Sequence, residues 1–275
     1  MHLHFAKMHG LGNDFMVIDR VTQDVQIDPE RICAWADRKT GIGFDQLLLL
    51  DVPTKPEADF WYRIYNADGS EAEQCGNGAR CVTTFAHARN LTTKNELHLQ
   101  TQGGGIITRK LSDRVQAEMC VPSIEPANIP FSTDEPALSY ILDTPGGERE
   151  VTPVSIGNPH GVLFVDNVIA APVEEVGAML TAHARFPEGA NIGFCQVVDS
   201  GFLRLRVFER GVGETRACGT GACAAVVASR LHDRVGKHVK VSLPGGKVHI
   251  TWQGPGSIVT MTGPSTLVYE GSIVL

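Results

Sequence analysis

Hydrophobic and polar positions alternate, or nearly alternate, in two segments that lie far apart in the chain. These segments are residues 60–65 (FWYRIY) and residues 202–208 (FLRLRVF). In an extended chain, alternation places the apolar side chains on one face, which can then pack against a core. Both segments are therefore predicted to form half-buried β-strands.

Two pairs of apolar segments are joined by glycine-rich turns. The first pair, residues 97–101 and 106–110, flanks three consecutive glycines, and the second pair, residues 239–243 and 247–252, flanks Pro244-Gly-Gly246. Gly and Pro mark turns because their backbones adopt, or are fixed in, conformations that turns require. Each pair is predicted to form a β-hairpin.

Two segments without Gly or Pro are predicted to be helical. Residues 80–89 and 223–231 each have an apolar face, and each directly follows a Cys-Gly-x-Gly-Ala sequence. A helix with one apolar face packs that face against a sheet. Each half of the chain is therefore predicted to be mostly β with one prominent central helix.

The two halves of the chain repeat each other. Cys75-Gly-Asn-Gly-Ala79 recurs as Cys218-Gly-Thr-Gly-Ala222, an offset of 143 residues (218 minus 75). Four further blocks recur in the same order at offsets between 142 and 150 residues. One match could arise by chance, but five in one order indicate two copies of one fold.

The repeat sets the expected domain boundaries. The first copy covers residues 1–123 and the second covers residues 138–265, while residues 124–137, rich in Pro and polar residues, are expected to be a linker. Residues 266–275 alternate enough to form a strand, which could complete a sheet in either half and is assigned to the first copy. The predicted fold class is α/β (α+β): two pseudo-symmetric β-rich domains, each wrapped around a central helix, with the active site in the interdomain cleft.

Composition and charge exclude several classes of protein. Of the 275 residues, 43% are hydrophobic and 20% charged, which excludes a disordered, collagen-like or coiled-coil chain. The net charge of −7 argues against broad binding to nucleic acid. No apolar run is long enough to span a membrane, and the first residues lack an apolar stretch of signal-peptide length. We therefore expect a cytoplasmic protein with reduced thiols and no nucleic-acid or membrane partner.

The seven cysteines include no C-x-x-C pair, so a structural zinc site and thioredoxin-like chemistry both lack their usual signature. Cys33, Cys120 and Cys195 are expected in the core, because a free cysteine behaves as a small hydrophobic residue. Cys81 and Cys223 lie within the predicted helices and are expected to be packing residues.

Cys75 and Cys218 differ from the other cysteines because each stands where a polar loop meets a predicted helix. Unpaired backbone N–H groups and the positive end of the helix dipole stabilise a thiolate there and lower the pKa of the thiol. Inverting a stereocentre by proton exchange needs a base on one face of the carbon and an acid on the other. Two thiols placed equivalently in two copies can supply both.

The glycines beside the two cysteines offer a site for a carboxylate. Backbone N–H groups at a helix start bind anions, and they also stabilise the negative charge that forms when an α-proton leaves. The expected donors are Gly76, Asn77, Gly219 and Thr220.

Six segments together resemble the diaminopimelate epimerase family, and the resemblance covers essentially the whole chain. They are Gly12-Asn-Asp-Phe15, Asn66-Ala-Asp-Gly69, Gln74-Cys-Gly-Asn-Gly-Ala-Arg-Cys81, Gly157-Asn-Pro-His160, Glu209-Arg210 and Ala217-Cys-Gly-Thr-Gly-Ala222. The resemblance implies epimerisation of LL-2,6-diaminopimelate to the meso isomer in lysine and peptidoglycan precursor synthesis. It also implies that no cofactor and no metal take part, and that the protein forms a homodimer.

The resemblance also implies the roles of individual residues. Cys75 and Cys218 resemble the acid–base pair, and His160 and Glu209 resemble groups that tune the pKa of the cysteines. The residues that resemble substrate-binding side chains are Asn13, Gln46, Asn66, Asn158, Asn191 and Arg210, with Glu209 as a further candidate and Gly76, Asn77, Gly219 and Thr220 as a backbone cradle.

The residue types agree with a substrate that carries two amino-acid ends. One end reacts, while the other can be held by amides, which both donate and accept, and by the guanidinium of Arg210, which can bind a carboxylate with two hydrogen bonds. The pseudo-symmetry breaks nine residues before each cysteine, where Asn66 stands in one copy and Glu209 in the other. With an amide on one side and a carboxylate on the other, the site would be polar in one direction.

Two other interpretations remain open from the sequence. A cofactor-independent racemase of the same architecture, similar to proline racemase, would share both cysteines but need fewer polar groups. A redox or metal-binding module would use Cys75, Cys81, Cys218 and Cys223, whose spacings suit zinc poorly.

Overall fold

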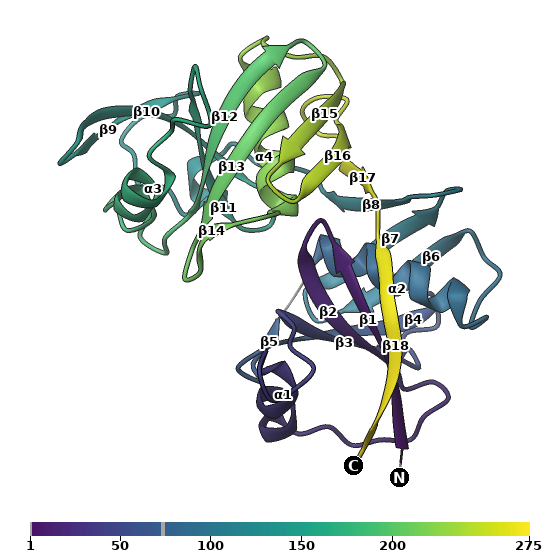
Figure 1. The fold of residues 1–275 in the computed structure, drawn as a ribbon. Helices are drawn as coiled ribbons and strands as arrows, with labels where there is room; N and C mark the ends of the chain where they lie inside the picture. The colour runs from purple at the N-terminus through teal and green to yellow at the C-terminus, as the bar shows by residue number, and fades with distance from the viewer. Residues whose placement is uncertain (1, 73–74) are drawn as a thin grey trace. The chain divides into compact units, whose positions relative to one another are not determined.

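The computed structural model describes residues 2–72 and 75–275, and the chain forms two compact units (Figure 1). Unit 1 consists of Met1–Glu118 and Thr262–Leu275, and unit 2 consists of Met119–Met261. Gln74, the first residue of the segment 74–81 that is quoted above for the family resemblance, lies outside the described residues. No helix in the described ranges is long and apolar enough to cross a membrane.

Unit 1 is built on a mixed sheet in the order β18-β1-β2-β3-β4-β6-β7-β8. Its strands are β1 (His2–Gly10), β2 (Asn13–Asp19), β3 (Gln46–Asp51), β4 (Phe60–Asn66), β5 (Glu71–Ala72), β6 (Glu96–Thr101), β7 (Gly104–Lys110), β8 (Val115–Cys120) and β18 (Thr266–Val274). The short strand β5 pairs with β4. The C-terminal residues thus add a strand to unit 1, antiparallel to β1.

Two helices pack against this sheet. Helix α1 (Pro29–Ala36) begins at Asp28, whose side chain accepts the N–H of Arg31, and it covers one cluster of buried apolar side chains. Helix α2 (Gly76–Ala88) contributes Ala79, Val82 and Phe85 to a second cluster.

Unit 2 repeats this arrangement. Its strands are β9 (Tyr140–Thr144), β10 (Gly147–Ser155), β11 (Pro159–Phe164), β12 (Asn191–Asp199), β13 (Phe202–Glu209), β14 (Gly213–Thr215), β15 (His238–Leu243), β16 (Gly246–Thr251) and β17 (Val259–Gly263), the last at the point where the chain returns to unit 1. Its helices are the 3-10 turn η1 (Pro126–Asn128), α3 (Val173–Thr181) and α4 (Gly219–Leu231).

The strand pairings confirm that the two units are copies of one fold. In unit 1 the successive pairs from β1/β2 to β6/β7 are antiparallel, parallel, antiparallel, parallel and antiparallel. The pairs from β10/β11 to β15/β16 in unit 2 follow the same sequence. Helices α2 and α4 each have 13 residues and stand at equivalent places in this order.

Two expectations need adjustment, one on where the helices begin and one on the linker. Helices α2 and α4 begin four residues before the segments predicted to be helical, because both cysteine motifs already form the first turn. Residues 124–137, expected as a linker, contribute the buried side chains of Ile129 and Phe131 to the core of unit 2. A Pro-rich segment can still bury the apolar residues that stand between its prolines, and Ile129 and Phe131 are such residues.

The predictions of cysteine burial are confirmed in part. Cys81, Cys195 and Cys223 are buried, as predicted, and burial raises the pKa of Cys81 and of Cys195 to about 12. Cys33 is exposed on α1, so its assignment to the core is wrong, and Cys120 is half-buried. Cys33 lies on the outer side of a short amphipathic helix, whereas the buried positions are Ile32 and Ala36.

Candidate active site

Cys75 caps the N-terminus of α2. Its backbone is extended (φ −149°), and its Sγ accepts a hydrogen bond from the N–H of Gly78 at 3.3 Å. The sulfur therefore occupies the place that a serine or aspartate oxygen usually takes at a helix start. An N–H group that donates to the sulfur favours the thiolate over the thiol.

The glycine at position 78 allows close packing inside the protein and is not needed for close approach to a ligand. A Cβ at this position would lie 2.1 Å from the hydroxyl of Tyr62, which is buried and donates to the carbonyl oxygen of Cys75 at 3.2 Å. The glycine lets Tyr62 hold the start of α2, and with it the sulfur of Cys75, against the sheet.

The predicted polar side chains of unit 1 lie on three neighbouring strands, β2, β3 and β4. The Oδ1 atom of Asn13 lies 3.9 Å from the Sγ of Cys75 and accepts from the Nδ2 of Asn77 at 3.3 Å. On adjacent strands, the Nε2 of Gln46 donates to the Oδ1 of Asn66 at 2.9 Å. The structure thus places Asn13 and Asn77 beside Cys75, with Gln46 and Asn66 as a second hydrogen-bonded pair.

Cys218 caps the N-terminus of α4 at the equivalent place in unit 2, but its surroundings differ. The side chain is buried, and its Sγ lies 3.6 Å from the hydroxyl of Thr220. Burial, followed by the charge of Glu209, raises the pKa of Cys218 well above its usual value, although Thr220 and the N–H of Gly221 act in the opposite direction. The expectation of a lowered pKa is therefore wrong for Cys218, because loss of water outweighs the helix N-terminus.

Glu209 stands at the end of β13 with its carboxylate turned towards Cys218. Its Oε1 also accepts from the hydroxyl of Thr215 on β14. Because the thiol of Cys218 donates to this carboxylate, Glu209 holds Cys218 in its protonated form. Asn66, at the equivalent place in unit 1, has no charge to act on Cys75 in this way.

The remaining predicted side chains of unit 2 lie in the bend before β11, on β11 and β12, and in the turn after β13. His160 is fully buried, and burial, then the charge of Arg210, lowers its pKa to about 3, so the imidazole is neutral at physiological pH. Its Nε2 donates to the Oδ1 of Asn158 at 3.1 Å. His160 pairs in register with Asn191, whose Oδ1 accepts the N–H of Arg210 at 2.9 Å.

The guanidinium of Arg210 is held by the backbone, since its Nη1 donates to the carbonyl oxygen of Glu188 at 2.5 Å. The predicted residues of unit 2 therefore form two contact groups in the structure. One contains Cys218, Glu209 and Thr220, and the other contains Asn158, His160, Asn191 and Arg210.

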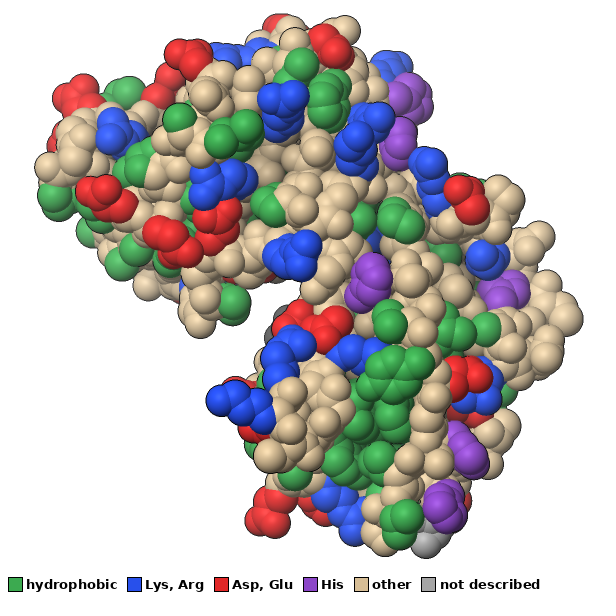
Figure 2. Space-filling view, viewed as in Figure 1, with side chains coloured by type: hydrophobic (Ala, Val, Ile, Leu, Met, Phe, Trp, Pro, Cys, Tyr) green, Lys and Arg blue, Asp and Glu red, His purple; other side chains and the backbone are tan. Residues whose placement is uncertain are grey.

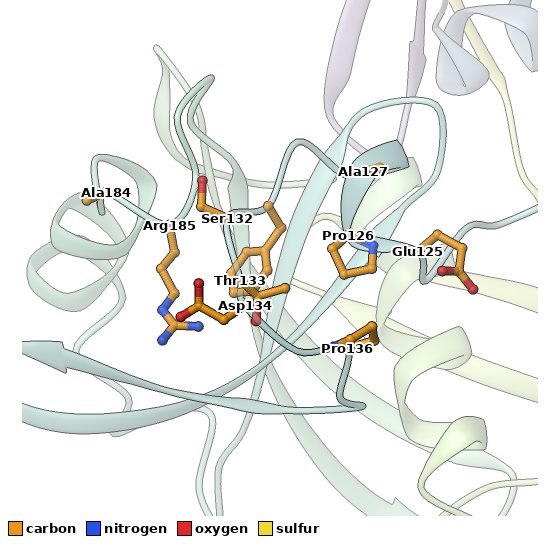
Figure 3. A pocket seen from close by; sticks show the side chains of 10 residues that line it. Glu125, Pro126, Ala127, Ser132, Thr133, Asp134, Pro136, Ala184 and Arg185 are labelled. Atoms are coloured by element: carbon orange, nitrogen blue, oxygen red, sulfur yellow. The ribbon is translucent and has the colours of Figure 1, made fainter.

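An open pocket of about 870 Å³ in unit 2 does not coincide with these groups (Figure 3). It is lined by side chains that include Glu125, Phe131, Asp134 and Arg185, and none of the residues predicted for the site contributes to it. In residues 2–72 and 75–275, no group of three or more His, Cys, Asp or Glu side chains is arranged to hold a metal ion.

Three contributors to the site were missed from the sequence. Tyr62 anchors the start of α2, Asp45 accepts a hydrogen bond from Asn13, and the fully buried Arg80 donates to Asn77. The sequence places Arg80 on the same face of the predicted helix as Thr83, Thr84 and His87, so its burial could not be predicted. For Asp45 the one signal in the sequence is that it directly precedes Gln46, a predicted site residue.

Comparison with known proteins adds to this geometry. The family model described as diaminopimelate epimerase matches residues 5–123 and 152–268. A diaminopimelate epimerase of Pseudomonas aeruginosa is 53% identical over 276 residues, covering 100% of both chains, and one of Azotobacter vinelandii is 52% identical over 279 residues with the same coverage.

Solved structures with low sequence identity share the fold. A hydroxyproline epimerase from Agrobacterium vitis has a TM-score of 0.74 at 18% identity and covers 100% of this chain and 93% of its own. A phenazine biosynthesis protein from Bacillus anthracis has a TM-score of 0.73 at 16% identity, with 100% of both chains covered.

Proposed function

The chain belongs to the diaminopimelate epimerase family, and we propose that it interconverts LL-2,6-diaminopimelate and meso-2,6-diaminopimelate. The observation that carries the proposal is the 53% identity with a diaminopimelate epimerase over the full length of both chains. A proline racemase-like activity has less support, because a probable proline racemase shares only 19% identity with this chain. By the family's known role, the reaction belongs to lysine biosynthesis.

We propose a two-base mechanism in which Cys75 and Cys218 act on opposite faces of one α-carbon. A thiolate removes the α-proton, and the thiol of the other cysteine delivers a proton to the opposite face, so the configuration inverts. In the reverse direction the two cysteines exchange roles. The mechanism requires no redox step, because each proton that leaves the carbon is replaced by another, and we propose that it uses no cofactor.

The two helix starts support the developing charge. Backbone N–H groups of Gly76 and Asn77 in α2 and of Gly219 and Thr220 in α4 are proposed to bind the substrate carboxylate, into which the negative charge spreads as the proton leaves. This arrangement uses the helix N-terminus as an anion site in both units.

We propose that the unreacting end of diaminopimelate is bound by amides and one cation. The candidates are Asn13, Gln46, Asn66, Asn158, Asn191 and Arg210. The hydrogen bonds that hold Asn191 and Arg210 support this assignment, because groups fixed before binding lose less freedom when the ligand arrives.

The activity can be tested directly. Protein dialysed against a chelator, with no pyridoxal phosphate added, is expected to convert LL-diaminopimelate into a mixture with the meso isomer, measured by chromatography that separates the isomers. A folded protein that leaves LL-diaminopimelate unchanged would contradict the proposal. Inversion of L-proline in the same assay would favour the racemase alternative.

Glu209 is proposed to tune Cys218, and this makes a prediction about pH. Since the carboxylate raises the pKa of the thiol, Glu209→Gln is expected to lower it. The part of the profile of kcat/KM against pH that depends on Cys218 then moves to lower pH. In the reaction direction in which Cys218 acts as the acid, this is the fall in kcat/KM at high pH. In the direction in which Cys218 acts as the base, it is the rise in kcat/KM at low pH.

Glu214→Gln is the matched control, because Glu214 lies on β14 nearby but pairs with Arg206. The control profile is expected to stay in place. If both profiles match the parent protein, Glu209 does not tune Cys218.

We further propose that the protein is a cytoplasmic homodimer. A reducing compartment keeps Cys75 and Cys218 as free thiols, which the mechanism needs.

Strand β18 exposes Leu267, Val268, Tyr269 and Val274, each at least 41% accessible, and Figure 2 shows hydrophobic side chains gathered over the region of β1 and β18. An apolar patch of this kind suits a second copy. Sedimentation is expected to give a dimer that Val268→Lys dissociates, whereas a monomeric parent protein would refute the proposal.

A further inference from the structure

Four polar side chains in unit 1 form a continuous hydrogen-bonded row beside Cys75. The Nη2 of Arg80 donates to the Oδ1 of Asn77 at 3.0 Å, and the Nδ2 of Asn77 donates to the Oδ1 of Asn13 at 3.3 Å. The Nδ2 of Asn13 then donates to the Oδ2 of Asp45 at 3.0 Å. The row therefore runs in one direction, from a cation to a carboxylate.

The two ends of the row fix the orientation of both amides. An arginine side chain can only donate and a carboxylate can only accept, whereas an amide can turn over and exchange its oxygen for its NH₂ group. If Asn13 turned over, its oxygen would face the Asp45 carboxylate and its NH₂ group would face the NH₂ group of Asn77. Both contacts would be repulsive.

The orientation decides which atom of Asn13 faces the reactive sulfur. The Sγ of Cys75 accepts an N–H from Gly78 at 3.3 Å and lies 3.9 Å from the carbonyl oxygen of Asn13. One donor stabilises the thiolate and one acceptor stabilises the thiol. Cys75 therefore has a partner in each of the two protonation states through which a two-base reaction cycles.

Both ends of the row are anchored. Arg80 is fully buried, and its Nε and Nη1 also donate to the carbonyl oxygens of Pro264 and Gly76, each at 3.4 Å. A Cβ at Gly10 would lie 3.2 Å from its guanidinium, so a glycine makes room for it.

Asp45 is held at the other end, where its carboxylate accepts from the N–H of Asp14 at 3.1 Å and from Arg38 at 2.7 Å. Burial raises the pKa of Asp14, but hydrogen bonds from Arg38 and Lys7 outweigh it and lower the pKa to about 2. Arg38 thus joins two charged carboxylates, and this network fixes the loop that carries Asp45.

We propose that Asp45 and Arg80 are positioning residues, which hold the amide of Asn13 with its carbonyl oxygen towards Cys75. The inference deepens the proposed function, on which it rests, by naming what sets the protonation balance of one of the two cysteines. Neither residue needs to touch the substrate for this role.

The test uses Asp45, because removing the buried cation of Arg80 would also change the charge near Cys75. Asp45→Ala removes both the acceptor and the charge. Asp45→Asn removes the charge but keeps an acceptor oxygen for Asn13 and for the N–H of Asp14, and its NH₂ group then faces Arg38, whose exposed side chain can turn away into solvent. Asp59→Ala is the matched control, since Asp59 likewise accepts a backbone N–H, from His98, and pairs with a cation, Lys94.

The readout is the pH midpoint for alkylation of Cys75 by iodoacetamide, followed by peptide mass mapping, which does not depend on any enzymatic activity. The titratable groups around Cys75 in the described residues include Tyr62, Arg80 and Cys81, and all three stay unchanged in these variants. Without its hydrogen bond to Asp45, Asn13 turns its NH₂ group towards the sulfur more often, and this donor stabilises the thiolate. Asp45→Ala is therefore expected to lower the midpoint for alkylation by about 0.5 pH unit.

Steady-state kinetics give the second readout. Asp45→Ala is expected to lower kcat/KM about fivefold, which corresponds to the loss of one hydrogen bond. Asp45→Asn and Asp59→Ala are expected to keep both the midpoint and kcat/KM close to those of the parent protein.

Two results would overturn the proposal. Equal shifts of the midpoint in Asp45→Ala and Asp45→Asn would assign the effect to charge rather than to orientation. A midpoint unchanged in Asp45→Ala, with the folded state intact by thermal unfolding, would show that Asp45 does not orient Asn13. Because alkylation needs no substrate, either result stands apart from failure of the proposed activity.

Discussion

Replacing either Cys75 or Cys218 by alanine is expected to lower the rate of epimerisation by about 10³-fold or more. Proton transfer by a positioned side chain contributes about 10²- to 10⁴-fold to a rate, and the proposed mechanism uses both cysteines in each direction. Rates of conversion of LL-diaminopimelate and of the meso isomer, measured separately, check the prediction.

The single variants are also expected to differ from an inactive protein. With one cysteine left, the α-proton of one isomer can still exchange with solvent on the face that this cysteine reaches. Cys33→Ala is the control, because Cys33 is exposed on α1 and has no proposed role. Near-parental epimerisation by Cys75→Ala would exclude a mechanism that needs two thiols.

Gly78→Ala is expected to destabilise the folded protein by about 3 kcal/mol, which is at the upper end of the usual cost of overpacking a core. The added Cβ would lie 2.1 Å from the hydroxyl of Tyr62 and 3.2 Å from Leu48, and both side chains are fully buried. Either Tyr62 or the start of α2 must move, so the activity should fall as well. Urea denaturation measures the change in the free energy of unfolding.

Gly105→Ala provides the comparison, since no atom lies within 4 Å of the Cβ that it would add. Removing the hydroxyl in the double variant Gly78→Ala/Tyr62→Phe is expected to recover part of the lost stability. Equal stabilities for Gly78→Ala and Gly105→Ala would mean that α2 does not depend on this close packing.

Much of the fold follows from local patterns. The alternating segment at residues 60–65 becomes β4, and the glycine-rich turn after residue 101 joins β6 to β7, because periodicity and turn residues act over a few positions. The repeat of the cysteine motif predicts two copies, and the pairings of the two sheets bear this out. Parallel pairing of β2 with β3 depends on distant segments and was not predicted.

The candidate site was predictable in its residue types but not in its electrostatics. Both cysteines stand at helix starts, as their motifs indicate, yet the effect of burial on Cys218 depends on side chains that pack around it from elsewhere in unit 2. The partners of Asn13 show the same limit, because Asp45 and Arg80 reach it from different elements. Sequence spacing does not reveal such contacts, since they depend on how β2, α2 and the loop before β3 fold together.

If two cysteines exchange protons at one α-carbon, the reaction in heavy water must carry solvent deuterium into the product. Starting from LL-diaminopimelate, with product analysed early by mass spectrometry and by separation of the isomers, we expect one deuterium at the inverted carbon of each meso molecule. The LL substrate that remains should carry little deuterium, because the thiol that takes its proton is not the one that delivers deuterium. Early meso product without deuterium would show that a single group removes and returns the same proton, and the two-base account would then be wrong.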